Sequence, residues 1–263
     1  FSLKGFNLKD LNKKKVLKIL LIGCVAIGII GCTAVGVIIA RTPSIDTDNI
    51  AKILTESTII YDDKGNEVDT VFYENNRTNI KYEALPDNMV NAMVALEDKT
   101  FWKHNGFNFI RIGGAIVQAV FTGGDISGTS TLTQQLIKVT TQNNDHSVKR
   151  KINEILAASY MESTKYTKDE ILEAYLNNVP LTGDLVGVGI GARAYFGKEL
   201  EELTLAECAV LASITNNPSV YDPYRHPENV RQRQQLVLAK MYEVGFITQD
   251  EYLNALNQEL VYQ

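Results

Sequence analysis

The chain has 263 residues, of which 45% are hydrophobic and 22% are charged, as in an ordinary globular protein. Six lysines and one aspartate give residues 1–18 a net charge of +5, so the rest of the chain carries −10 of the total of −5. Such an acidic surface excludes nucleic acid as a ligand. The three cysteines and three histidines are scattered and no H-E-x-x-H occurs, so we expect neither a disulfide framework nor a metal site.

An apolar segment follows the basic tail. Residues 19–40 run without a charge, and roughly 33 Å of helix would cross a bilayer core. A cleaved signal peptide is the alternative, but its apolar core is shorter; "LIGC" and "IIGC" resemble lipoprotein-processing sites, but the apolar run continues past each cysteine. We therefore expect one retained span, with residues 1–18 in the cytoplasm and everything after Arg41 outside.

The remaining sequence predicts one domain over residues 56–263. A linker over residues 41–55 joins it to the membrane span. "STIIYDDKGNEVDTVF" (57–72) predicts two strands around a turn, next to the membrane. Beyond Pro86 the pattern is almost entirely helical, including an apolar stripe through Phe109, Ile112, Ile116, Val117 and Val120. Capping boxes predict three helix starts: Thr167 with Glu170, Thr204 with Glu207, and Thr248 with Glu251.

The first candidate site is "NAMVALEDKTFWKHNG" (91–106). Val90, Met93 and Val94 recur at helical spacing, and one turn later the same face carries Glu97. A carboxylate partly withdrawn from water suits proton transfer. The alternative is a solvated helix end.

The second candidate is "GTSTLTQQLIK" (128–138). Thr131 and Gln134 fit a further capping box, and the helix would bury Leu132, Leu136 and Val139. Thr131, Gln135 and Lys138 form a polar line along the other side, suited to phosphate at a helix N-terminus. A solvated helix face is the alternative, and no nucleotide P-loop is present.

The third candidate is "HSVKRKINEILAASYME" (146–162). Val148, Ile152, Ile155 and Leu156 form the predicted buried stripe. Arg150 and Glu154 are four residues apart, so an ordinary surface ion pair is the alternative to a functional role.

Five motifs in order resemble the signature of the family 51 glycosyltransferases, the peptidoglycan glycosyltransferase modules of bifunctional penicillin-binding proteins and their monofunctional relatives. They are "EDKTFWKHNG", "GTSTLTQQLIK", "KRKINEI", "ILEAYLNNV…GVGIGARAYFGK" and "LTLAECAVLA…NPSVYDP". The likeness runs from about residue 56 to the end of the chain. It implies a mainly α, lysozyme-like domain with two lobes, the smaller near the membrane. The implied activity is polymerisation of lipid II on the outer face of the plasma membrane.

The resemblance also implies roles for individual residues. Glu97 matches the general base on the acceptor hydroxyl, and Glu154 matches the second carboxylate, which orients cations or helps at the pyrophosphate. The remaining implied substrate-binding residues are Asp98, Phe101, His104, Ser130, Thr131, Gln135, Lys138, Arg150 and Lys151. The reaction inverts the anomeric centre and requires no cofactor, although Mg²⁺ or Mn²⁺ can help neutralise pyrophosphate. Two positions depart from the family pattern: His146 replaces an arginine and Val139 an asparagine.

Two other functions compete with this interpretation: a lysozyme-like enzyme that cleaves glycan, and a non-catalytic scaffold of the cell-wall machinery. No S-x-x-K occurs, so transpeptidase chemistry is not encoded in these residues. The sequence opens on Phe1, and we expect it to be a piece of a longer protein, whose relatives often continue into a transpeptidase domain. Expected partners are lipid II, the growing glycan, the plasma membrane, and proteins of cell-wall synthesis and division.

Overall fold

The computed structural model describes residues 18, 21–23, 25, 26, 33, 58–61, 67–71, 79–122, 128–141 and 148–263. The predicted basic tail, membrane span and linker therefore fall almost wholly outside the described residues, as does His146. In the part of the chain that is described, no helix has the length and apolar character needed to cross a membrane.

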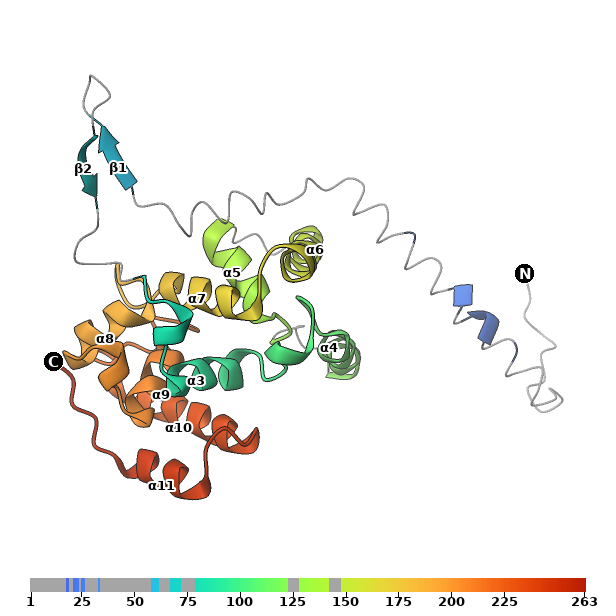
Figure 1. Cartoon of the computed structure of the whole chain (residues 1–263). Coiled ribbons are helices and arrows are strands. Elements are labelled where there is room, and N and C mark those ends of the chain that lie inside the picture. Colours follow the sequence, from blue (N-terminus) through green and yellow to red (C-terminus); the bar gives the residue numbers. More distant parts are fainter. Residues whose placement is uncertain are drawn as a thin grey trace.

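The described residues are mainly helical, as predicted (Figure 1). The segment predicted to form two strands holds β1 (Thr58–Tyr61) and β2 (Glu67–Val71), which pair antiparallel. The α-helices are α3 (Asp87–Glu97), α4 (Phe109–Thr122), α5 (Leu132–Thr141), α6 (Val148–Thr164), α7 (Lys168–Asn178), α8 (Val188–Phe196), α9 (Leu205–Ile214), α10 (Pro227–Glu243) and α11 (Gln249–Asn257). Short 3₁₀ helices of the described residues are η2 (Tyr82–Ala84), η3 (Phe101–Lys103) and η4 (Leu200–Glu202).

The three helix starts predicted from capping boxes are confirmed. Thr167, Thr204 and Thr248 each cap a helix: the side chain accepts a hydrogen bond from the backbone N–H three residues later, and the glutamate there accepts from the threonine N–H. Two backbone N–H groups that have no partner within the helix are hydrogen-bonded in this way at each helix start. Short local patterns therefore set where α7, α9 and α11 begin.

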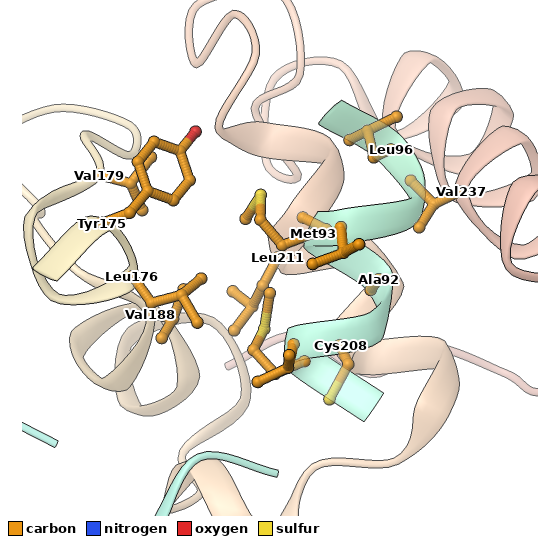
Figure 2. Packing of buried hydrophobic residues seen from close by; sticks show 14 of the residues in the cluster. Ala92, Met93, Leu96, Tyr175, Leu176, Val179, Val188, Cys208, Leu211 and Val237 are labelled. Atoms are coloured by element: carbon orange, nitrogen blue, oxygen red, sulfur yellow. The ribbon is translucent and has the colours of Figure 1, made fainter. Parts of the chain in front are cut away.

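The core is built around α9. Every residue from Ala206 to Ile214 is buried, and α9 packs against both α3 and α10. Figure 2 shows Met93 of α3 and Leu211 of α9 among side chains from α7 and α10. This apolar packing fixes the body of α3, and with it the place where α3 ends at Glu97.

A second group of helices lies beside this core. In Figure 1, α4, α5 and α6 lie together on one side, and α8 to α11 on the other. α5 packs against α6 and α7. The chain runs from α3 through the loop of residues 98–108 into α4, so this loop joins the apolar core to the second group.

Two predicted helix faces differ from the structure. On α4, Phe109, Ile110 and Val117 are exposed, so part of its apolar stripe faces outward. On α6 the predicted stripe is wrong at Leu156, which is exposed, whereas Ile152 and Ile155 are half-buried. The buried residues of this helix include Glu154, Ala157, Ala158 and Met161. The reason is close packing: a side chain at Gly106 would lie 2.4 Å from the backbone of Ala158, so α6 turns its small residues toward this loop.

Candidate active site

Glu97 is the last residue of α3 and lines a cavity of about 800 Å³. Its side chain is half-buried, and its Oε2 accepts a hydrogen bond of 2.7 Å from Gln135 Nε2 on α5. Gln135 Oε1 in turn accepts from the buried hydroxyl of Tyr175 on α7. Burial and the charge of Glu97 raise the pKa of Tyr175, so that hydroxyl remains a donor. The carboxylate is thereby oriented from one side and left open to the cavity on the other.

Two cations cover the C-terminal end of α3. Lys240 Nζ donates to the carbonyl of Leu96 at 3.1 Å, and both terminal nitrogens of Arg111 donate to the carbonyl of Glu97 at 3.2 Å. A helix C-terminus disfavours a carboxylate, and cations there offset the partial negative charge. These two side chains explain how an acid is accommodated at the end of α3.

The loop after α3 is organised by Asp98, which is fully buried. Its Oδ2 lies 2.9 Å from His104 Nε2 and accepts from the backbone N–H of Leu132 at 3.2 Å. Its Oδ1 accepts from Arg111 and from Thr100. Asp98 thus ties the loop to the first turn of α5. Three predicted residues, Asp98, Phe101 and His104, have almost no exposed side chain and do not line the cavity.

The predicted residues of the second candidate motif meet at the start of α5. Ser130, Gln135 and Lys138 line the cavity. Thr131 is buried; its Oγ1 donates to the carbonyl of Gly106 and accepts from Gln134 N–H. The side chain of Gln134 donates to the carbonyl of Gly106. Thr131 therefore caps α5, whereas the Gln134 side chain binds the backbone of the loop after α3.

Glu154 and the basic pair form a compact ion cluster on α6. Arg150 lies 2.6 Å and Lys151 3.6 Å from the buried carboxylate of Glu154. Lys151 Nζ also donates to Ser130 Oγ at 2.6 Å and to Gln134 Oε1 at 2.7 Å. Burial lowers the pKa of Lys151, and Glu154 opposes that shift. None of the three α6 residues lines the cavity, and Ser130 connects them to it.

The described walls of the cavity are strongly cationic. One carboxylate, Glu97, faces four cations: Arg111, Lys138, Arg233 and Lys240. Lys138 is exposed and makes no ion pair within the described residues. A cationic hollow in a chain with a net charge of −5 is suited to an anionic ligand such as phosphate.

Arg111, Tyr175, Arg233 and Lys240 are cavity residues that sequence reasoning missed. Arg233 and Lys240 are seven residues apart on α10, the spacing of one helix face over two turns, which was the available signal. No group of three or more His, Cys, Asp or Glu side chains among the described residues is arranged to hold a metal ion.

Comparisons with known proteins identify relatives of this chain. The family model described as Transglycosylase matches residues 64–242. Penicillin-binding protein 1A of Clostridium botulinum (strain Langeland) is 39% identical over 219 residues, which cover 79% of this chain and 26% of that protein. Penicillin-binding protein 1A of Clostridium perfringens (strain 13) is 38% identical over 249 residues, which cover 91% of this chain and 36% of that protein.

A solved structure also aligns. It is the crystal structure of penicillin-binding protein 1A from Haemophilus influenzae, with a TM-score of 0.44 and 23% identity, covering 78% of this chain and 21% of that chain. The chain spans well under half of the length of the curated relatives that it matches.

Proposed function

This chain belongs to the transglycosylase family, and we propose on that premise that it is a peptidoglycan glycosyltransferase. It polymerises lipid II into β-1,4-linked glycan strands for the bacterial cell wall and releases undecaprenyl pyrophosphate. The observation that carries this proposal is the cavity in which Glu97 faces Lys138 and three further cations. A proton acceptor and an anion-binding surface in one cavity are the two parts that such a transfer needs.

Glu97 is the general base in this proposal. The acceptor's sugar hydroxyl gives its proton to the Glu97 carboxylate as its oxygen bonds to the anomeric carbon of the growing chain. The 2.7 Å hydrogen bond from Gln135 holds the carboxylate in place, and Asp98, Phe101 and His104 fix the loop behind it. Because attack and departure occur on opposite faces of the sugar, the product is inverted without a covalent sugar–enzyme intermediate.

The leaving group is the lipid diphosphate, released as its bond to the anomeric carbon breaks. Lys138 binds it directly, together with Ser130 and the start of α5. Lys151 holds the Ser130 hydroxyl at 2.6 Å, so that Ser130 can donate its own proton to a phosphate oxygen. Glu154 orients Arg150 and Lys151, and no cofactor is required. Mg²⁺ or Mn²⁺ would act only by neutralising phosphate charge.

A second group of cavity cations consists of Arg111, Arg233 and Lys240. We assign them to the diphosphate of the acceptor lipid II, because both substrates carry this group. Arg111 and Lys240 already contact the end of α3, so an anion bound there would lie close to the base.

The anchoring of the enzyme is part of the proposal. Residues 1–18 lie in the cytoplasm and residues 19–40 cross the plasma membrane. Residues 41–55 connect this span to the extracellular domain, which comprises residues 56–263 and is lysozyme-like with two lobes. The exposed apolar residues of α4 support a smaller lobe close to lipid. Because their lipids hold both substrates in one bilayer, a tethered enzyme meets them at high effective concentration.

Incubating the full chain with lipid II in detergent tests the function. The expected product is glycan polymer; shortening of preformed glycan would indicate a cleaving enzyme, and no reaction of either kind would indicate a scaffold. Glu97→Gln keeps the shape of the side chain and removes its proton affinity, so polymerisation should fall at least about 100-fold. Glu243→Gln, at an exposed acid on α10, is the matched control and should polymerise normally.

A further inference from the structure

Glu162 is a buried acid that the proposed mechanism does not use. Its side chain is 2% exposed, on the face of α6 that turns toward the loop after α3. Its carboxylate accepts hydrogen bonds from the backbone N–H of Gly106, from Thr133 Oγ1 and from Lys168 Nζ. A buried charge is tolerated only where donors surround it, and here the donors come from the loop, α5 and α7.

Gly106 is the residue on which these contacts converge. Its N–H donates to Glu162, and its carbonyl accepts from Thr131 Oγ1 at 2.8 Å and from Gln134 Nε2 at 3.0 Å. Its φ is +82°, and a Cβ there would lie 2.4 Å from the backbone of Ala158. Both observations require glycine at this position. The loop is thus held between α6 and the first turn of α5.

From Gly106 the hydrogen bonds reach the diphosphate side of the cavity, and the chain itself leads toward the base. Toward the diphosphate side, Gln134 accepts from Lys151, and Lys151 donates to Ser130. Toward the base, His104 precedes Gly106 by two residues in the same loop and contacts Asp98, the residue next to Glu97. The loop at Gly106 therefore adds a second connection between the proposed base and the proposed diphosphate site, beside the direct hydrogen bonds from Gln135 to Glu97 and from Leu132 N–H to Asp98.

Glu162 also faces His104. Its Oε2 lies 3.8 Å from His104 Nδ1, a buried nitrogen that has no hydrogen-bond partner in the described residues. The imidazole ring therefore lies between two buried carboxylates, Asp98 on one edge and Glu162 on the other. Lys168 Nζ forms an ion pair with Glu162 Oε2 at 2.6 Å. The same Nζ lies over the ring of Phe101, 4.2 Å from its centroid.

We propose that Glu162, neutralised by Lys168, is a positioning residue: it fixes Gly106 and thereby sets the distance between the Glu97 base and the diphosphate-binding start of α5. This inference rests on the proposed function. A misplacement of about 1 Å can lower a rate about 100-fold, because near-attack geometry is lost while substrate contacts remain. Loss of the Glu162 charge should therefore act on kcat and spare KM.

The experiment compares two buried glutamates in the full chain. Glu162→Gln leaves a neutral amide among three donors and should lower kcat for lipid II about 10-fold or more, with KM little changed. Glu207→Gln is the matched control, because Glu207 is also buried, pairs with Lys198 at 2.7 Å and accepts from Thr204, but belongs to α9. We expect both variants to lower the melting temperature and only Glu162→Gln to lower kcat.

The outcomes separate this inference from the proposed function. Polymerisation by the unaltered chain with equal kcat in Glu162→Gln would overturn the positioning role alone, as would equal losses of kcat in Glu162→Gln and Glu207→Gln. Absence of polymerisation by the unaltered chain would overturn the function. If Glu162→Gln does not fold, Thr133→Val removes one of the donors to Glu162 without changing size. It should then give a smaller loss of kcat, again at constant KM, and an unchanged kcat would contradict the role.

Discussion

The two ends of α3 lie in different surroundings. Toward its start, Met89, Ala92 and Met93 have no exposed surface and lie in the apolar core with α9 and α10. At its end, Glu97 and Asp98 lie among buried hydrogen bonds and ion pairs that link α5, α6 and the loop of residues 98–108. Apolar burial is the main source of stability, whereas a satisfied polar network fixes positions. We therefore expect mutations in the first region to change stability and mutations in the second to change rate.

The largest expected effect is on stability. Leu211 of α9 has no exposed surface and lies near α3 (Figure 2). Leu211→Ala should lower the free energy of unfolding by about 2–5 kcal/mol, because it leaves a cavity in a closely packed core. Urea unfolding measures this loss, and kcat should be unchanged at temperatures where the variant is folded. A fall in kcat of the folded variant would show that the core also determines the site geometry.

Lys138→Met is the corresponding change in the cavity. Lys138 is exposed, so the free energy of unfolding should remain the same. Loss of one preorganised cation at the leaving group should lower kcat/KM by about 100- to 1,000-fold. Lys81→Met removes another exposed lysine, one paired with Glu173 away from the cavity, and should leave the kinetics unchanged. Equal kinetics in the two variants would remove Lys138 from the site.

Local sequence patterns were sufficient for most of the helices and for part of the site. The capping boxes are contained within four residues. Of the predicted polar line of Thr131, Gln135 and Lys138, the last two line the cavity from one helix, whereas Thr131 is buried. Glu97 was recognisable because it interrupts an apolar face. The meeting of Glu97 with Gln135, 38 residues later, was expected only from the motif resemblance.

Other features depend on packing between distant segments and were not predictable from periodicity. Lys240 contacts the end of α3 across 144 residues, and Glu162 reaches Gly106 across 56. The buried face of α6 was assigned wrongly at Leu156, because the apolar residues suggested one stripe, whereas close approach of Gly106 selects Ala158. Exposure of Phe109 and Ile110 likewise depends on which neighbours α4 has.

A smaller effect is expected for Lys240→Met, which tests whether the second cation group binds the acceptor. Loss of one charge-assisted contact should raise KM for acceptor lipid II about 10-fold, with a smaller change in kcat. Lys99→Met is the matched control, since Lys99 also lies near the end of α3 but pairs with Glu243 and does not line the main cavity. If KM stays constant in Lys240→Met, the acceptor diphosphate does not bind at α10.

The smallest expected effect is a change in pH dependence. Burial and the neighbouring Arg233 lower the pKa of Lys240, and Glu97 opposes the shift. As pH rises, Lys240 therefore loses its proton before an ordinary lysine would. The cavity loses a cation in this range, so polymerisation should decline. Lys240→Arg keeps the charge and should move this decline to higher pH in a plot of log kcat/KM against pH.

Stability should respond to the same titration in the opposite direction. Between the lowered pKa and the ordinary value, the unfolded chain binds more protons at this position than the folded chain. The contribution of Lys240 to the free energy of unfolding therefore rises with pH across that range. An alkaline loss of activity caused by Lys240 should thus occur without unfolding, as followed by circular dichroism at each pH. A decline that coincides with unfolding, or one that Lys240→Arg does not move, would show that the charge of Lys240 has no part in the reaction and that α10 belongs only to the apolar region.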